Sequence, residues 1–531
     1  MSLLKKIASA FRRTPSKQQI RRPAQRQAIP AEVADIIQEV GYDIDFLITR
    51  LNHPGKNLQD RAEKRAEAMQ RLQELGPEAE KAITALIEKL FAEEVQERKL
   101  AAETLERIDP NWPANDFTRQ QLPFLVKKLG KGQLAANRAI TVLSKVGPAA
   151  EPYLKEVLQP GGSSDELQKA KALRAWSRVD NKSEGLIAAI RHTLQEAEAK
   201  LVLEGAVETL GELDRPEAVD QSLLYPLLDH EDAVLRHKTV KALSNYPAIA
   251  EEALPLLFKS LAAEQEELRK EAVALLQKQD SEVATAFYRE IVFQHGELQE
   301  GDIEATFDKL SFIFSKSTVE EFRLRKSKFV DNLSWYSFEL KQEMERPKRL
   351  LQSVLEILNA QSPPDPELAE ALMTCFEEHE RFGIRKACVE LLAKNTQEKE
   401  AVIPLLVQQF DSASGGLRPL IIVALNGLDP DWVNRPVTLT LIRKLTQQLN
   451  TSGTVEAAEE KLLSIGDRVA PVLVAELEQS DKRVVRQQLI DILGQLGPAA
   501  EIDVEQLRRM EADCTNTRTQ EALQKLIGQL E

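Results

Sequence analysis

The strongest constraint on this chain is a pattern of apolar residues that occurs twice, with the same internal spacing, within residues 231–280. One helical face carries Leu235, Thr239, Ala242 and Leu243, and the pattern returns as Leu268, Ala272, Leu275 and Leu276. A second apolar stripe runs from Ile249 to Leu261 between them. Neither helix can bury so broad an apolar surface alone, so the sequence predicts helix pairs that stack on neighbouring pairs.

Glycine or aspartate followed by proline separates the two helices of several units. These turns are Gly76-Pro77, Gly147-Pro148, Gly497-Pro498, Asp109-Pro110 and Asp429-Pro430. Gly is expected to take the left-handed conformation that ends a helix, and Pro at the start of the next helix needs no backbone donor. The turns from Gly76 to Asp214 are unevenly spaced, which excludes a strict tetratricopeptide repeat.

The predicted fold class is all-α, an α-solenoid of stacked antiparallel helix pairs with about 12 units and one irregular insertion. Hydrophobic residues make up 43% of the 531 residues and aromatic residues only 5%, which suits closely packed helices rich in Leu and Ala. We divide the chain into a basic tail at 1–30, an N-terminal solenoid at 31–295, an aromatic-rich insertion or bend at 296–345, and a C-terminal solenoid at 346–531 that ends in a cap helix.

A repeated motif, D-x-x-V-R-x-x-A-x-x-A-L-x-x-L-G-P, underlies this division. It is met best by Asp232–Leu243, Ile384–Leu392 and Val484–Pro498. The motif resembles HEAT repeats, particularly the short bacterial HEAT-like units of phycobilisome lyases, and the resemblance covers roughly four fifths of the chain. It implies a superhelix of helix pairs but no particular activity, because one fold carries many roles.

The N-terminus is basic although the whole chain has a net charge of −14. Residues 1–28 hold eight Lys or Arg and no acid. Within residues 1–13, one helical face carries Leu3, Leu4, Ile7 and Phe11. This pattern is typical of a short amphipathic helix that binds an anionic membrane surface or a partner's groove, and the alternative is a disordered basic tail. No apolar run approaches the roughly 20 residues of a transmembrane segment, so none is expected.

The helical periodicity fails at 296–345, where eight aromatic residues lie between Phe307 and Phe338. Aromatic and Arg side chains dominate the energetics of protein interfaces. Candidate partner-binding residues are therefore Phe312, Phe314, Phe322, Arg323, Arg325, Trp335 and Tyr336. The alternative is an enlarged repeat whose aromatic side chains fill a wider core at a bend of the solenoid.

One arginine recurs shortly before the apolar triplet of each first helix. The members of this row are Arg98, Arg236, Arg269, Arg385, Arg418 and Arg486. The row either binds acidic peptides or phosphates, or forms an internal ladder in which each Arg caps or bridges an acid at a neighbouring turn, such as Asp232, Glu266 or Asp481. We favour the internal ladder, because the chain is acidic overall.

No residue pattern indicates a catalytic site, a cofactor site or a metal site. The six histidines lack metal-ligand spacing, and no phosphate-binding loop or nucleophile elbow is present. The three cysteines, Cys375, Cys388 and Cys514, form no CxxC pair, which favours a reducing compartment and a cytoplasmic protein, peripheral to a membrane if the N-terminal helix binds one.

The predicted function is a non-enzymatic scaffold or adaptor that binds a protein partner along the concave surface of the solenoid. An acidic chain suits a basic partner and not nucleic acid, because phosphates need a positive surface. Two alternatives stay open. The resemblance implies that a lyase- or glycosylase-like HEAT enzyme could act on a macromolecular substrate, and residues 1–13 would suit a peripheral membrane adaptor.

Overall fold

The computed structural model describes residues 43–53, 57–159, 164–297, 310–314, 344–361, 365–413, 415–500 and 502–531. Every regular element within these ranges is helical, which confirms the all-α solenoid, whereas the number of units stays a prediction. The chain divides into two compact units, Met1–Asn181 (unit 1) and Lys182–Glu531 (unit 2). The boundaries predicted at 30, 295 and 345 differ from this division and stay predictions.

Unit 1 alternates α-helices with short 3-10 turns. Its α-helices are α3 (Ile44–Leu51), α4 (Leu58–Leu75), α5 (Ile83–Lys89), α6 (Val95–Ile108), α7 (Asp116–Arg119), α8 (Leu122–Lys128), α9 (Gln133–Val146), α10 (Glu151–Val157) and α11 (Glu166–Val179). Its 3-10 turns are η1 (Gly76–Ala82), η2 (Trp112–Ala114) and η3 (Gly147–Ala150).

Unit 2 continues the same alternation of helices and turns. Its α-helices up to the aromatic-rich stretch are α12 (Glu184–Glu196), α13 (Lys200–Leu210), α14 (Tyr225–Leu228), α15 (Ala233–Leu243), α16 (Leu254–Leu261), α17 (Glu266–Leu276) and α18 (Glu282–Glu297). Beyond it lie α22 (Arg346–Ala360), α23 (Ala369–Glu378), α24 (Phe382–Lys394), α25 (Lys399–Ser412), α26 (Leu417–Leu428), α27 (Pro436–Gln448), α28 (Val455–Ile465), α29 (Ala470–Gln479), α30 (Arg483–Leu496), α31 (Val504–Ala512) and α32 (Thr517–Leu530). Its 3-10 turns are η4 (Pro216–Ala218), η5 (Gln221–Leu224), η6 (Glu251–Ala253), η7 (Ser311–Ile313), η9 (Pro366–Leu368), η10 (Trp432–Asn434), η11 (Asp467–Val469) and η12 (Pro498–Ala500).

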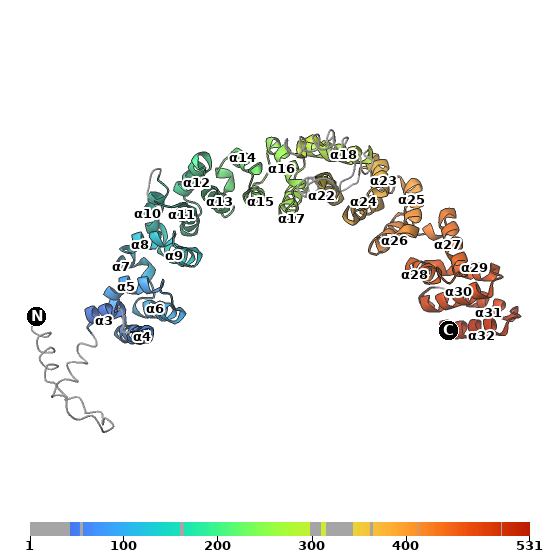
Figure 1. The fold of residues 1–531 in the computed structure, drawn as a ribbon, viewed down its shortest axis with the longest axis horizontal. Helices are drawn as coiled ribbons and strands as arrows, with labels where there is room; N and C mark the ends of the chain where they lie inside the picture. The colour runs from blue at the N-terminus through green and yellow to red at the C-terminus, as the bar shows by residue number, and fades with distance from the viewer. Residues whose placement is uncertain are drawn as a thin grey trace, which may run out of the picture. The chain divides into compact units, whose positions relative to one another are not determined.

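The helices of unit 2 form two layers. The A layer consists of α13, α15, α17, α22, α24, α26, α28, α30 and α32, and the B layer of α12, α14, α16, α18, α23, α25, α27, α29 and α31. Each A helix packs on the next A helix and on the B helix that precedes it in the chain. Figure 1 shows the layers clearly in the middle of unit 2, where α15, α17, α22 and α24 lie below α14, α16, α18 and α23. In unit 1 the corresponding A helices are α4, α6, α9 and α11.

The apolar stripes found in the sequence form the core between these layers. Leu235, Leu243, Leu268 and Leu276 are completely buried, as predicted. Burying such a side chain stabilises the fold by roughly 1.5–3 kcal/mol. Thr239 is also fully buried, and its hydroxyl donates to the carbonyl of Leu235 at 2.8 Å, so this polar group of the stripe has its hydrogen bond.

The glycine and aspartate turns differ in backbone conformation. Gly76, Gly147 and Gly497 have φ of 57°, 74° and 73°, so the predicted positive φ is confirmed. Their ψ values of −130°, −150° and −169° nevertheless lie outside the left-handed helical region, in a region open essentially to glycine alone. Asp109 and Asp429 have φ of −148° and −153°, so aspartate ends the helix with extended backbone instead. The aspartates, which carry a Cβ, therefore make this turn with extended backbone rather than with a positive φ.

Two of the aspartate turns contain the same tryptophan motif. Trp112 and Trp432 are 4% and 1% exposed. Each indole nitrogen donates to the side chain six residues earlier, Glu106 at 3.2 Å and Asn426 at 2.9 Å. The carbonyl of Trp432 accepts from the buried Thr438 hydroxyl at 2.8 Å. Each tryptophan thus joins the two helices of its unit.

The repeats on the two sides of the aromatic-rich stretch contact each other directly. Helix α22 packs on both α17 and α18, and α23 packs on α18. The hydroxyl of Ser353 in α22 donates to the carbonyl of Leu261 at 2.9 Å, and the Gln277 amide donates to the carbonyl of Glu356 at 3.1 Å. The helix pair α22–α23 thus occupies the next position of the two layers after α17–α18.

Candidate functional site

Three of the six repeat arginines each donate to two carbonyls of the loop that precedes their own helix. Arg98 donates to the carbonyls of Ala92 and Glu93 (2.9 and 2.5 Å), Arg236 to those of His230 and Glu231 (2.6 and 2.8 Å), and Arg269 to those of Ala263 and Glu264 (2.7 Å each). Burial lowers the pKa of Arg236 and Arg269. Each of these arginines therefore fixes the loop between a B helix and the next A helix.

Of the other three arginines, Arg418 alone also donates to a carbonyl of the loop before its own helix. Arg385 donates to the Gln409 side chain at 2.8 Å and lies over the ring of Phe376 at 4.8 Å from the ring centre. Arg418 donates to the carbonyl of Ala413 at 2.8 Å and forms an ion pair with Glu460 at 2.7 Å. Arg486 is half-buried beside a cavity of about 420 Å³ that Glu478 and Asp503 also line. The six repeat arginines therefore do not all make the same contacts.

Two of the acids named as partners of this row form ion pairs with lysines instead. Asp232 forms an ion pair with Lys200 at 2.5 Å, and Glu266 forms one with Lys270 at 2.5 Å. Among the described residues, Arg418 is the one member of the row in an ion pair. For Arg98, Arg236 and Arg269 the acceptors are backbone carbonyls rather than carboxylates, because the loop before each of their helices turns its carbonyl oxygens toward the guanidinium.

The candidate partner-binding residues of the aromatic-rich stretch fall into three groups. Phe314 is buried at 8% exposure, together with Leu310 and Ile313. Phe312 is 40% exposed and packs edge-on against Phe287, with ring centres 5.8 Å apart. Outside the described residues lie Phe322, Arg323, Arg325, Trp335 and Tyr336, and also the N-terminal Leu3, Leu4, Ile7 and Phe11. Of the seven aromatic-stretch candidates, Phe312 alone is both described and exposed.

No group of three or more His, Cys, Asp or Glu side chains within the described ranges is arranged to hold a metal ion. Two histidines, His295 on α18 and His379 directly after α23, form a buried pair with ring centres 5.7 Å apart. Burial, with a smaller contribution from His379, lowers the pKa of His295 to about 3. Cys375 is a buried thiol whose pKa burial raises to about 12. His295 and Cys375 are therefore neutral at pH 7.

All helices of the described ranges are too short or too polar to span a bilayer. The thiols of Cys375, Cys388 and Cys514 are free. Cys388 is completely buried, and its place in the apolar stripe follows from its alignment with Thr239.

Exposed apolar side chains recur at the starts of the A helices, and the sequence reasoning missed them. Six of the eleven large apolar side chains exposed in the described ranges occupy the first or second residue of an A helix. They are Val95 (67% exposed) and Leu134 (72%) in unit 1, and Leu201 (38%), Val234 (52%), Phe382 (53%) and Val484 (54%) in unit 2. We call the four in unit 2 the apolar edge. Four of the six lie two or three residues before a repeat arginine, so the alignment of the arginines contained the signal.

Comparison with known proteins identifies HEAT repeats in one segment of the chain and gives no function. A family model for HEAT repeats matches residues 187–277, so the predicted HEAT repeats are confirmed in that segment. Comparison with curated proteins gives no match. Similar solved structures include importin beta crystallised in ammonium sulfate, at 14% identity and a TM-score of 0.35 over 94% of this chain and 70% of that one. A Kap95:Nup1 complex is similar at 15% identity and a TM-score of 0.40 over 96% and 76% of the two chains. At these values the likeness says nothing about what this chain binds.

Proposed function

We propose that this chain is a non-enzymatic scaffold or adaptor that binds a partner protein along the A layer of its HEAT-type repeats. The apolar edge of unit 2, formed by Leu201, Val234, Phe382 and Val484, carries this proposal. Single exposed apolar residues are ordinary on protein surfaces. Their recurrence at one position of the repeat supports a common role, because each of these side chains keeps between 38% and 54% of its surface exposed.

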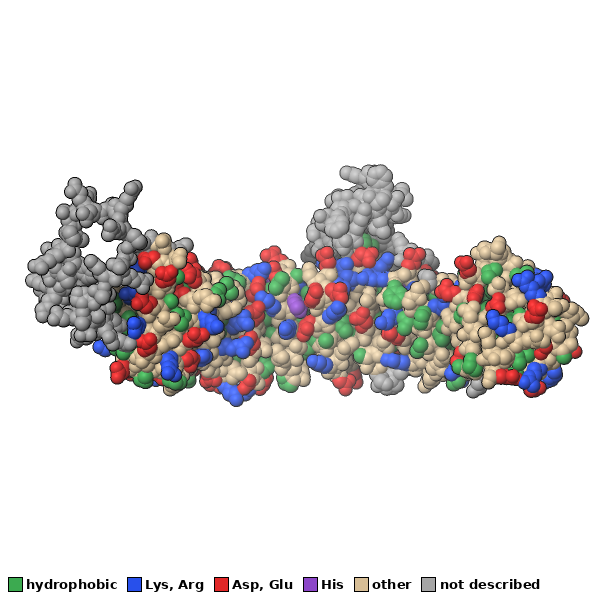
Figure 2. Space-filling view, turned by 90° about the horizontal axis from the view of Figure 1, so that it is seen from below, with side chains coloured by type: hydrophobic (Ala, Val, Ile, Leu, Met, Phe, Trp, Pro, Cys, Tyr) green, Lys and Arg blue, Asp and Glu red, His purple; other side chains and the backbone are tan. Residues whose placement is uncertain are grey.

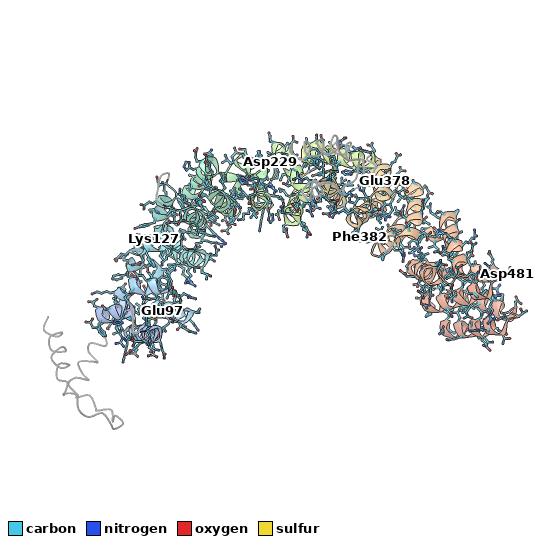
Figure 3. All side chains as sticks on the ribbon, in the orientation of Figure 1. Glu97, Lys127, Asp229, Glu378, Phe382 and Asp481 are labelled. Atoms are coloured by element: carbon cyan, nitrogen blue, oxygen red, sulfur yellow. The ribbon has the colours of Figure 1, made fainter. Side chains whose placement is uncertain are left out.

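The apolar edge is held on a fixed backbone, which favours binding. Val234 lies two residues before Arg236, and the guanidinium of Arg236 holds the carbonyls of His230 and Glu231. Phe382, labelled in Figure 3 on α24, lies three residues before Arg385, which is anchored on Gln409. A surface that is ordered before binding loses less conformational entropy on association.

The net charge of the whole chain supports a protein partner with basic groups. Acids outnumber Lys and Arg in the whole chain by 14. Figure 2, drawn from the side of the A helices in the middle of unit 2, shows hydrophobic side chains interspersed with acidic and basic ones. An interface of this kind places apolar anchors in the centre and charges at the rim, where complementary charge speeds association.

Site-specific photo-crosslinking tests the proposal. A photo-reactive phenylalanine analogue would replace Phe382 in one variant and Val484 in another, within the full chain expressed in its native cell. Matched control variants would carry the analogue at Glu370 and Gln408, which are exposed on the B helices α23 and α25. We expect both apolar-edge positions, and neither control, to crosslink to the same protein. No adduct, or equal adducts from all four positions, would refute the proposal.

The contact of residues 1–13 with an anionic membrane is a second, separate proposal. It is supported by the apolar face of Leu3, Leu4, Ile7 and Phe11 and by the eight cations of residues 1–28. A single short helix binds weakly, so co-sedimentation with vesicles should use a high content of anionic lipid. We expect the full chain to bind and a chain of residues 29–531 to stay in solution. Equal partitioning of both would reject membrane contact.

A further inference from the structure

A groove of about 280 Å³ lies between α4 and α6, two neighbouring A helices of unit 1. Ala62 and Ala66 of α4 and Leu100 of α6 line it with half-buried apolar side chains, and Met69, which also lines it, is fully buried. We call this the α4–α6 groove. A groove lined in this way favours an apolar occupant, whose burial removes apolar surface from water.

Side chains join the two walls of the α4–α6 groove, so the groove exists before anything binds. Nη1 of Arg65 on α4 donates to both carboxylate oxygens of Glu97 on α6, at 2.9 and 3.1 Å (Figure 3, where Glu97 is labelled). The Gln73 amide of α4 donates to the Thr104 hydroxyl of α6 at 3.0 Å. A surface that is already ordered loses less conformational entropy when it binds.

Two carboxylates line the groove without forming an ion pair with any described residue. They are Glu63 and Glu94, and both are exposed. Glu63 accepts a hydrogen bond at 3.0 Å from Gln59, whose amide is neutral. Lys64, the cation next to Glu63 in the sequence, forms an ion pair with Asp60 at 2.8 Å. An occupant with cations beside its apolar side chains therefore matches both parts of the groove.

We propose that residues 1–13 of this chain dock in the α4–α6 groove. Their sequence predicts a helix with Leu4, Ile7 and Phe11 on one face. Leu4 and Phe11 are about 10 Å apart along such a helix, which equals the rise of α4 across the residues that line the groove. The membrane contact proposed above would use the same apolar face, so a docked segment cannot bind a membrane at the same time.

The charges of this segment suit the two carboxylates of the groove. Lys5, Lys6, Arg12 and Arg13 lie off the apolar face, and residues 1–28 contain no acid. Attraction between exposed charges of opposite sign is screened by salt, so docking should weaken as the salt concentration rises.

The described chain begins next to the groove, which brings residues 1–13 within reach of it. Helix α3 follows directly on Asp43 and packs on α4. Residues 14–42 connect the segment to α3 and can span up to about 95 Å at 3.3 Å per residue. That is more than three times the roughly 27 Å length of α4. Because the connection makes docking intramolecular, a contact too weak to hold a free peptide is sufficient.

Photo-crosslinking within the full chain, without lipid, tests the proposal. A photo-reactive phenylalanine analogue would replace Phe11 in one variant and Ser9, on the opposite helical face, in the matched control. Mixing chains of two isotopic compositions distinguishes adducts within a chain from adducts between chains. We expect the Phe11 variant to form adducts with α4 or α6 of the same chain, and the Ser9 variant to form far fewer. No adduct, adducts only with other elements or only between chains, or equal yields from both positions would overturn the proposal.

Charge reversal separates docking from folding. Glu63→Lys combined with Glu94→Lys should lower the adduct yield of the Phe11 variant about tenfold, because two attracting carboxylates become repelling cations. Glu78→Lys combined with Glu88→Lys makes the same change of charge at exposed residues of η1 and α5, outside both groove helices, and should keep the yield. Equal yields from the two double variants would overturn the proposal. The scaffold and membrane proposals do not depend on this result, because the test contains no partner and no lipid.

Discussion

Acidification should loosen the contact between α18 and α23 more than any neighbouring contact, because the buried imidazole of His295 lies there and protonation gives it a charge. His295 is 2% exposed, and its Nε2 has no hydrogen-bond partner. Its pKa is about 3 in the folded protein because of burial, against 6.5 in the unfolded chain. A base whose folded-state pKa is depressed contributes stability that is fully present above pH 6.5. That stability is lost as the pH falls from 6.5 toward 3, because the unfolded chain binds the proton first.

The magnitude follows from the difference between the two pKa values. Each pH unit below 6.5 lowers the free energy of opening by up to about 1.4 kcal/mol. At pH 5 the loss is about 2 kcal/mol, which corresponds to a roughly 30-fold increase in the open population of this contact.

Hydrogen exchange with mass spectrometry at pH 7 and pH 5, corrected for the intrinsic exchange rate, measures this population separately for each helix. Peptides from α18 and α23 should open about 30-fold more at pH 5, and peptides from α30 should change far less. His295→Phe keeps a ring in place and removes the titrating group, so its α18 and α23 peptides should follow α30. The control His192→Gln changes an exposed histidine and should behave as the unmodified chain. Equal pH dependence in the unmodified chain and His295→Phe would refute the reasoning.

Two further substitutions test the turns that join the helices. Gly497→Ala should destabilise α30 by about 1–3 kcal/mol, because φ is 73° at this residue. Steric crowding is not the cause, since no atom lies within 4 Å of an added Cβ. Gly427→Ala, within an exposed part of α26, should instead stabilise that helix by about 0.5–1 kcal/mol. Hydrogen exchange of the two helices measures both, and a loss of equal size at Gly427 would show that backbone conformation is not the cause. Asn426→Ala should lower the free energy of opening of α26 by about 1–3 kcal/mol in the same assay, because it leaves the buried indole nitrogen of Trp432 without an acceptor. A decrease below about 0.5 kcal/mol would contradict this.

The sequence determined the layers of the fold because their signal is local and periodic. Leu235 and Leu268 belong to apolar stripes with the period of an α-helix, and a stripe of that width predicts a buried helix face without knowledge of the partner helix. The Asp-Pro-x-Trp motif that ends in Trp112 recurs at Trp432, so the equivalence of these two positions is also evident from the sequence. The glycine turns were predicted correctly in φ and not in ψ, since the sequence shows that glycine is needed but not which of its extra conformations is used.

The candidate sites depend on contacts that no local pattern contains. The position of Arg236 in the repeat was evident, but its acceptors are backbone carbonyls whose direction is set by the path of a loop. Arg236 and Arg346 line one cavity although they lie far apart in the sequence, on opposite sides of the aromatic-rich stretch. Their approach follows from α22 packing on α17, which becomes visible only when the helices on both sides of that stretch are placed in space.

That packing of α22 on α17 and α18 has a consequence for the continuity of the backbone. Non-covalent contacts already join the repeats on either side of residues 298–345, through the buried hydroxyl of Ser353 and the apolar faces of three helices. A peptide bond cut inside that stretch would therefore leave two polypeptides with complementary surfaces. Protease cleavage there is expected to yield fragments that co-elute as one species, and two genes encoding the halves could together supply the whole protein.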